Sequence, residues 1–257
     1  MKIGTSNLRF ALRWVCGHLV VCVLVATIAA LLVFLIWYPA PWRQMLGVES
    51  IFLMLMGIDI VCGPLLTFIL ASSQKPKRTL VLDLSVVAMI QVAALGYGMW
   101  SVFVARPVVV AFEVDRFVVV SANEVASMEF DEASPNVRHL SWTGPRYVAT
   151  RSARTADEQL KSIELSMKGV TTAMRPDWWI PYEEAASDVN RAAIPLMDLL
   201  EKRVGQEDVL KRAAERSGFR VTELFYVPLT SSQQMDWVML LDTAGRVVGH
   251  ARVDGFD

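Results

Sequence analysis

Charged residues are almost absent from three stretches in the first 105 residues of this chain. Residues 14–41 contain no Asp, Glu, Lys or Arg, residues 50–73 contain only Asp59, and residues 80–105 contain only Asp83. Each stretch exceeds the roughly 20 residues that a helix needs to cross a hydrocarbon core about 30 Å thick. A helix satisfies its own backbone hydrogen bonds in lipid, so each stretch is predicted to be a membrane helix. A membrane protein of this kind is not one of the common soluble enzymes. We predict three membrane spans, at about residues 14–38, 51–71 and 80–105.

Cysteine is absent from residues 106–257, because all three cysteines lie inside the apolar stretches. This part of the chain therefore has no disulfide framework and no thiolate metal site. The histidines, His18, His139 and His250, lack ligand spacing with one another or with any cysteine. The chain also has no G-x-S-x-G, no P-loop and no G-x-G-x-x-G motif. We predict no metal, no cofactor and no catalytic residue, so an enzyme is the least favoured class.

Basic residues predict the orientation of the spans. Three precede the first stretch and three more lie in residues 72–78, where no acid occurs, whereas the first loop holds only Arg43 and Glu49. Because Lys and Arg resist translocation, the N-terminus and the second loop are predicted to be cytoplasmic. Three spans then place residues 106–257 in the periplasm of a bacterium, with the helices in its inner membrane. A cleaved signal peptide is disfavoured, because its apolar core is about 7–15 residues long.

Residues 106–257 carry 18 Lys and Arg against 23 Asp and Glu, so this part is mildly acidic. It has no electrostatic footprint for nucleic acid, which is not expected as a partner. Its 152 residues suit one compact core. Because three membrane spans are predicted, the lipid bilayer is the first partner that we expect.

The pattern of residues 106–257 predicts strands at both ends and helices between them. Runs of β-branched and aromatic residues predict strands over residues 106–115, 116–120, 224–229, 236–242 and 246–253, with a short one near Tyr147. Apolar residues at helical spacing predict helices over residues 155–168, 187–204 and 206–217, the second broken or kinked at Pro195. A capping box from Ser121 to Glu124 predicts the start of a short helix, and residues 131–151 have the composition of a loop. This order predicts an α+β domain with an antiparallel sheet.

A series of short motifs runs through the chain. They are WYP at residues 37–39, GIDIVCGPLLT at 57–67, Asp83 with Gln91, ARPVVVAFEVDRF at 105–117, GP at 144–145, WIPY at 179–182, YVPL at 226–229 and DGF at 254–256. With these motifs in this order, the chain resembles the TfpX/TfpZ family of type IV pilin accessory proteins over nearly its whole length. The resemblance implies a non-enzymatic, chaperone-like role in pilus assembly, in which the protein binds, stabilises or presents its major pilin at the inner membrane.

The alternative function is that of a membrane-anchored periplasmic sensor or ligand-binding module. The segments predicted to be cytoplasmic are too short to hold an output domain, which disfavours signalling. The sequence leaves open which pilin is the partner, whether contact is through the spans or the periplasmic domain, and the oligomeric state.

Asp59 and Asp83 are the two acidic residues within the spans. A carboxylate there is costly unless it is paired, protonated or hydrated, so each is a candidate functional residue. At 1.5 Å per residue, Asp59 is ~12 Å from the outer end of its span and Asp83 is ~5 Å inside the cytoplasmic end. This offset disfavours an intramembrane aspartyl protease, whose two carboxyl groups share one proton.

Three interpretations of these aspartates stay open. Asp83 is an interfacial residue near Lys77 and Arg78, or Asp59 pairs within the bundle with Gln91 or His18. Alternatively, one carboxylate receives the polar N-terminal region of a client helix, for which Asp83 has a suitable depth.

The aromatic segment Trp178, Trp179 and Tyr182 is the third candidate for client binding. It is too apolar for a plain exposed loop, and aromatic side chains are favoured as interface anchors. Packing in the core is the alternative.

Overall fold

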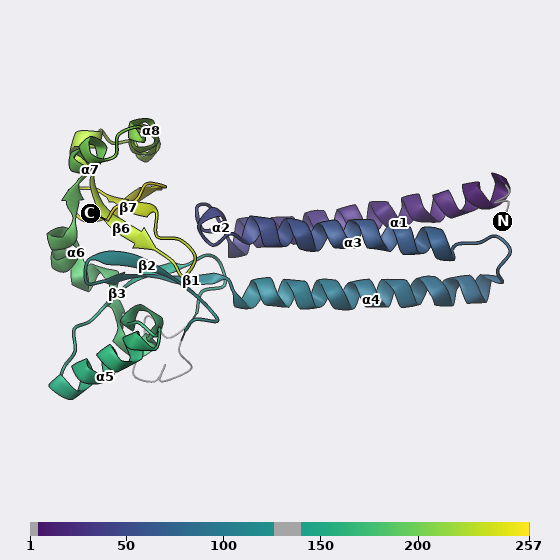
Figure 1. Cartoon of the computed structure of the whole chain (residues 1–257), viewed down its shortest axis with the longest axis horizontal. Helices are drawn as coiled ribbons and strands as arrows, with labels where there is room; N and C mark the ends of the chain where they lie inside the picture. Colours follow the sequence, from purple (N-terminus) through teal and green to yellow (C-terminus); the bar gives the residue numbers. More distant parts are fainter. Residues whose placement is uncertain (1–4, 126–139, 257) are drawn as a thin grey trace. The chain divides into compact units, whose positions relative to one another are not determined.

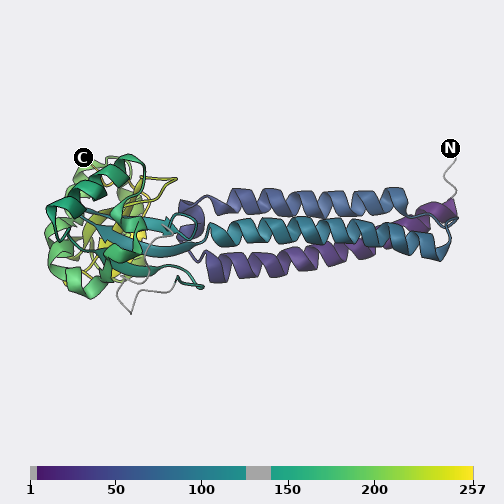
Figure 2. The same cartoon turned by 90° about the horizontal axis from the view of Figure 1, so that it is seen from below.

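The computed structural model describes residues 5–125 and 140–256 of the chain. These residues form two compact units, Met1–Val104 and Ala105–Asp257. The first unit is helical, and the second contains a sheet with helices around it (Figures 1 and 2).

Three long helices make up the first unit. The elements are α1 (Thr5–Leu31), which continues as the short π-helix η1 (Leu32–Trp37), then α2 (Trp42–Met45), α3 (Val48–Leu70) and α4 (Lys77–Val104). Three helical segments are long and apolar enough to cross a membrane: Asn7–Trp37, Val48–Leu70 and Lys77–Val104. The three predicted apolar helices are therefore present, each beginning a few residues earlier than the pattern of charges indicated.

Helix α3 packs against both α1 and α4. Small residues permit close approach: a Cβ added at Gly98 would lie 2.4 Å from a methyl carbon of Leu55. At one end of the unit, the buried Tyr38 hydroxyl donates to the Val102 carbonyl at 2.9 Å. This bond ties the segment after η1 to the last turn of α4.

An eight-stranded sheet forms the centre of the second unit. The strands are β1 (Pro107–Glu113), β2 (Arg116–Ser121), β3 (Arg146–Thr150), β4 (Trp179–Pro181), β5 (Ile194–Pro195), β6 (Phe225–Thr230), β7 (Trp237–Leu241) and β8 (Val247–Ala251). Their order is β4-β3-β1-β2-β6-β7-β8, and β5 pairs with β6 outside this path. β1 is buried along nearly its whole length, as expected for a central strand rich in valine.

The sheet is mixed, so the prediction of an antiparallel sheet was wrong. Five strand pairs are antiparallel, but β1 pairs with β3 and β2 pairs with β6 in parallel. Parallel neighbours need a long connection. The chain supplies one between β1 and β3, which includes β2, and another between β2 and β6, which holds all the helices of this unit.

The helices predicted between residues 155 and 217 are present in the second unit. They are α5 (Ala156–Met167), α6 (Ala186–Ala192), α7 (Leu196–Lys202) and α8 (Glu207–Ser217), with one-turn 3-10 helices between some of them. The Thr155 side chain caps α5 by accepting from the Glu158 amide, and Gly218 at φ +79° ends α8. The helix expected over residues 187–204 is two helices, since β5 and Pro195 interrupt it.

The expected helix at Ser121 is a turn over the part that the structure describes, up to residue 125. The capping contact is nevertheless present, because the Ser121 amide donates to Glu124 Oε2 at 2.8 Å. The loop expected over residues 131–151 lies in part outside the described residues, and β3 occupies its end.

Two buried clusters lie on the sheet. One gathers Leu196, Leu199, Leu210 and Tyr226 from α7, α8 and β6, and the other gathers Val109, Val148 and Trp179 from β1, β3 and β4. In Figure 1, α7 and α8 accordingly lie beside β6 and β7, whereas α5 lies toward β1 and β3.

Candidate functional site

A polar pair, Asp59 and Gln91, joins α3 to α4 inside the helical unit. The Gln91 amide nitrogen donates to Asp59 Oδ1 at 3.1 Å and to the Asp59 carbonyl at 3.3 Å. Gly63 leaves room for this amide, because a Cβ there would lie 2.1 Å from Gln91 Nε2. Asp59 is the middle residue of α3. It therefore lies ~17 Å from either end of the helix, deeper than the sequence indicated.

Of the two partners considered for Asp59, the structure brings Gln91 to it and not His18. The imidazole of His18 instead lies 2.5 Å from Thr67 Oγ1, which links α1 to α3. The Gln91 Oε1 atom is buried without a hydrogen-bond partner among the described residues. Such polar links between helices are typical of membrane bundles. A role for Asp59 in client binding stays a prediction.

Asp83 forms an ion pair with Lys75, in the loop before α4, at 2.6 Å. The two side chains are 29% and 34% exposed, so the pair lies at the edge of the unit. Asp83 is eight residues from Gln91 on α4. The two aspartates are therefore ~12 Å apart along the helix axis, too far to share a proton. The ion pair fits an interfacial residue, but the paired cation is Lys75, whereas the sequence pointed to Lys77 and Arg78. A role of Asp83 in receiving a client helix stays a prediction.

The aromatic segment is buried, with Trp178 3% exposed and Trp179 2% exposed. The indole of Trp179 donates to the Ala173 carbonyl at 2.8 Å. Two guanidinium groups contact the Trp178 ring, those of Arg151 at 4.7 Å and Arg175 at 5.1 Å from its centroid. Both tryptophans therefore pack in the core, which leaves them little surface for a partner.

Tyr182 is half-buried, and its hydroxyl donates to the Gly245 carbonyl at 2.7 Å. Burial, with smaller effects of Tyr147 and nearby carboxylates, raises the pKa of Tyr182 above its ordinary value. The phenol is therefore neutral and fixed to the turn between β7 and β8. Client binding through Tyr182 or the two tryptophans stays a prediction.

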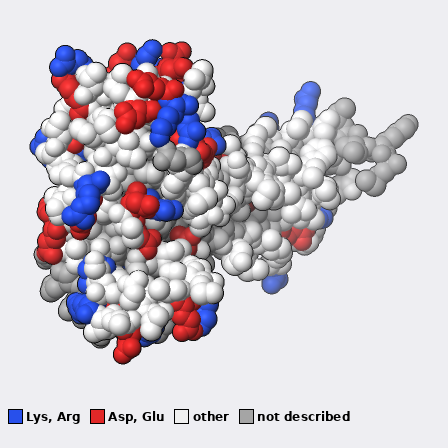
Figure 3. All heavy atoms as spheres, turned by 60° about the vertical axis from the view of Figure 1, so that its left-hand side comes forward, with Lys and Arg blue, Asp and Glu red and all other residues white. Residues whose placement is uncertain are grey.

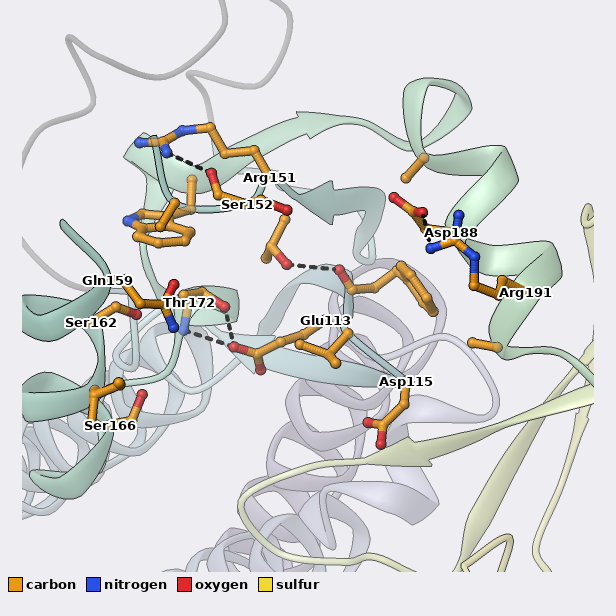
Figure 4. Close-up of a pocket in the computed structure, with 18 of the residues that line it drawn as sticks. Glu113, Asp115, Arg151, Ser152, Gln159, Ser162, Ser166, Thr172, Asp188 and Arg191 are labelled. Atoms are coloured by element: carbon orange, nitrogen blue, oxygen red, sulfur yellow. Dashed lines mark hydrogen bonds and ion pairs between the residues drawn. The ribbon is translucent and has the colours of Figure 1, made fainter. Parts of the chain in front are cut away.

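A groove of about 890 Å³ lies in the second unit, and Trp178 is part of its lining. Its walls come from the end of β1, the β1–β2 turn, the segment after β3, one face of α5, and α6. Figure 4 shows Gln159, Ser162 and Ser166 of α5 on one side, with Glu113 and Asp115 on the other. The groove is therefore a cleft between helix and sheet with polar groups on both walls.

The charged groups of the groove are held by specific contacts. Arg151 donates two hydrogen bonds to Glu158, at 2.6 and 3.1 Å, and the backbone amide of Arg154 donates a third. These hydrogen bonds lower the pKa of Glu158 to about 2. Glu113 Oε1 accepts from the amides of Thr172 and Ala173 at 2.9 and 3.3 Å. Both glutamates thus hold the connections around α5 in place.

Helical spacing and composition did not predict that these residues share a groove. The apolar stripe on α5 predicted a buried face, but Leu160, Ile163 and Met167 are 65%, 49% and 85% exposed. The one signal was the FEVD motif at residues 112–115, all four of which line the groove.

Within residues 5–125 and 140–256, no cluster of three or more His, Cys, Asp and Glu side chains could hold a metal ion. Figure 3 shows acidic and basic side chains interspersed over one face of the second unit, and few charges on the helical unit. No single-sign patch of the kind that binds nucleic acid is visible on that face.

The fold thus defines a protein with three long apolar helices followed by a mixed-sheet domain that carries a polar groove. The family model described as "Fimbrial assembly protein FimB" matches residues 6–47. Two relatives from Dichelobacter nodosus, the fimbrial assembly proteins of serogroups I and E1, are 33% and 32% identical over 241 residues. Each alignment covers 93% of this chain and 94% of the relative.

A third relative, the fimbrial assembly protein of serogroups C1 and C2 of the same organism, is 39% identical over 116 residues. That alignment covers 45% of this chain and 88% of the relative. No solved structure matches the chain. The chain belongs to the family of fimbrial assembly proteins. This confirms the expected role in fimbrial assembly, and the narrower TfpX/TfpZ naming stays a prediction.

Proposed function

We propose that this protein is a bacterial inner-membrane accessory of type IV pilus assembly that binds the major pilin and stabilises or presents it. The observation that carries the proposal is the similarity to fimbrial assembly proteins over 93% of the chain, spanning both units. With a helical unit and a sheet domain in one chain, the protein could engage both the apolar helix and the globular head of the pilin.

The surface of the helical unit supports a place in the bilayer. Large apolar side chains point away from the bundle, among them Leu53, Ile69 and Val92 at 67%, 67% and 70% exposed. In water such a surface would be costly, because burying apolar area is worth roughly 25 cal/mol per Å². With the distribution of Lys and Arg, this supports a cytoplasmic N-terminus and a periplasmic second unit.

The first experiment is a pull-down of the tagged full-length protein from gently solubilised membranes, probed for the major pilin. The proposal expects recovery of pilin, and loss of surface pili in a deletion strain. If pilin is absent from the eluate and the deletion strain is fully piliated, the proposal fails and the sensor alternative takes its place.

A second experiment addresses Asp83. Asp83→Asn is expected to weaken recovery of pilin without lowering the abundance of the protein, if the carboxylate receives a client cation. The matched control is Lys75→Gln, which removes the ion-pair partner of Asp83 and should leave recovery equal or higher. Lost abundance in Asp83→Asn would show a structural role instead.

A further inference from the structure

The turn between β1 and β2 holds a strained and exposed apolar residue. Val114 has a φ of +60° and is the only non-glycine residue with a positive φ in the part of the chain that the structure describes. A β-branched residue is disfavoured there because its Cβ lies too close to the following carbonyl oxygen. Its side chain is 82% exposed, so packing within the described residues does not offset the strain. Strain of this kind concentrates at sites that contact ligands.

Val114 lines the groove and lies in the chain between Glu113 and Asp115, which Figure 4 shows across the groove from the helical wall. That wall contributes Ile163 and Met167, which are 49% and 85% exposed. Apolar side chains on both walls are therefore open to solvent at one cleft. An apolar side chain of a partner bound in this cleft would remove apolar surface from water.

The polar side chains of the helical wall repeat along the groove. Gln159, Ser162 and Ser166 lie on one face of α5, at spacings of three and four residues. Seven residues of helix rise ~10 Å, and an extended chain covers this length with about three residues. Ser162 is buried at 7% exposed, whereas Gln159 and Ser166 at the two ends of this line are exposed and suit the repeating amide groups of an extended polypeptide.

The charges of the groove favour a basic partner. Its lining includes three carboxylates, Glu113, Asp115 and Asp188, and two cations, Arg151 and Arg191. Both cations are occupied, Arg151 by Glu158 at 2.6 Å and Arg191 by Asp188 at 3.0 Å. Glu113 makes no ion pair among the described residues and accepts only from neutral donors. Asp115 pairs with its neighbour Arg116 at 2.8 Å, so Glu113 is the carboxylate of the strand wall that lacks an ion pair in the part of the chain that the structure describes.

We propose that this groove binds an extended segment of the fimbrial subunit, with an apolar side chain between Val114 and Met167 and a basic side chain facing Glu113. The proposal rests on the proposed function for the identity of the partner. It adds the contact surface and the chemistry of the segment that it accepts.

The test is site-specific photocrosslinking in cells that assemble pili, with the full-length protein. A photoreactive residue at position 167 is expected to crosslink to the major pilin. The matched control is position 160, because Leu160 lies on the same helix and is 65% exposed but does not line the groove. Equal crosslinking at the two positions, or crosslinking of position 167 to lipid or another protein only, would overturn the proposal.

Two substitutions separate binding from folding. Val114→Gly removes the strain, so the thermal midpoint should be unchanged or higher while recovery of pilin falls. Asp115→Lys should reduce recovery about tenfold or more, because it opposes like charges. Its control is Asp236→Lys, which reverses a comparable exposed, Arg-paired carboxylate outside the groove. If both reversals reduce recovery equally, or if Val114→Gly binds like wild type, the groove proposal fails.

The outcomes also distinguish this proposal from the proposed function. Pilin recovered by the wild type but unaffected by these variants leaves the proposed function standing and refutes the groove. A wild-type protein that recovers no pilin refutes both.

Discussion

Gly63 is expected to have opposite effects on stability depending on whether Gln91 is present. The three atoms nearest to a Cβ at Gly63 all belong to the Gln91 amide, at 2.1 to 2.9 Å. Gly63→Ala therefore forces this amide away and removes its two hydrogen bonds to Asp59. Interhelical hydrogen bonds in membrane bundles average about 0.6 kcal/mol, so the loss is about 1 kcal/mol. In a Gln91→Ala background the clash is absent, and Ala should gain about 0.5–1 kcal/mol over Gly in a helix interior.

The assay is a double-mutant cycle on the full-length protein in mild detergent, with unfolding by a graded denaturing detergent. The expected coupling between positions 63 and 91 is about 1 kcal/mol, from the lost hydrogen bonds, because the helix preference of Ala is gained in both backgrounds and cancels. A matched control is Gly57→Ala, because a Cβ at Gly57 meets no atom within 4 Å. If Ala at position 63 changes stability by the same amount with and without Gln91, the reasoning is wrong.

Three further predictions concern the second unit. Because hydrogen bonds from Arg151 help to lower the pKa of Glu158 to about 2, its ion pair should stabilise the fold above the ordinary glutamate pKa and lose this effect as the pH falls toward 2. The thermal midpoints of the wild type and Glu158→Gln should therefore converge in acid, and a constant gap between them would contradict this. Trp179→Ala should destabilise the unit by about 3–5 kcal/mol because the side chain is 2% exposed, which limited proteolysis of the full chain would detect as faster cleavage, with exposed Trp142→Ala as the control. Gly218→Ala should cost about 1 kcal/mol because φ is +79°, whereas Gly249→Ala, at a residue without positive φ, should not show this backbone strain.

The sequence predicted the local elements well because their signals are local. Thr155 and Gly218 carry the caps of α5 and α8, and Pro195 lies at the break that it predicted. The apolar helices follow from long runs without charge. Each of these features depends on residues within a turn or two of one another.

The sheet direction could not be predicted in the same way. Phe117 lies beside Leu229 in the parallel pairing of β2 with β6, and the register between such distant strands leaves no local pattern. The valines of β1 indicated burial but not which strands would lie on each side. The long connection between β2 and β6, which holds the helices, lets the chain return in the same direction, and the two strands therefore pair in parallel.

The candidate sites were predicted in part. Asp59 pairs with Gln91 as one of the two options allowed, because a polar side chain in an apolar helix seeks the nearest polar partner. The groove was missed because helical spacing shows which residues of α5 share a face but not whether that face is covered. Ile163 and Met167 share a face as expected, and solvent covers it.

The parallel pairing of β2 with β6 has a consequence for synthesis. The Thr230 hydroxyl donates to the Phe117 carbonyl across 113 residues of chain. At about 5–20 residues per second, a ribosome needs roughly 6–23 s to make that interval. During this time one edge of the valine-rich strand β2 has no strand beside it, and such an edge invites pairing with other chains. A nascent chain of this protein is therefore expected to need shielding of this edge until β6 has been made.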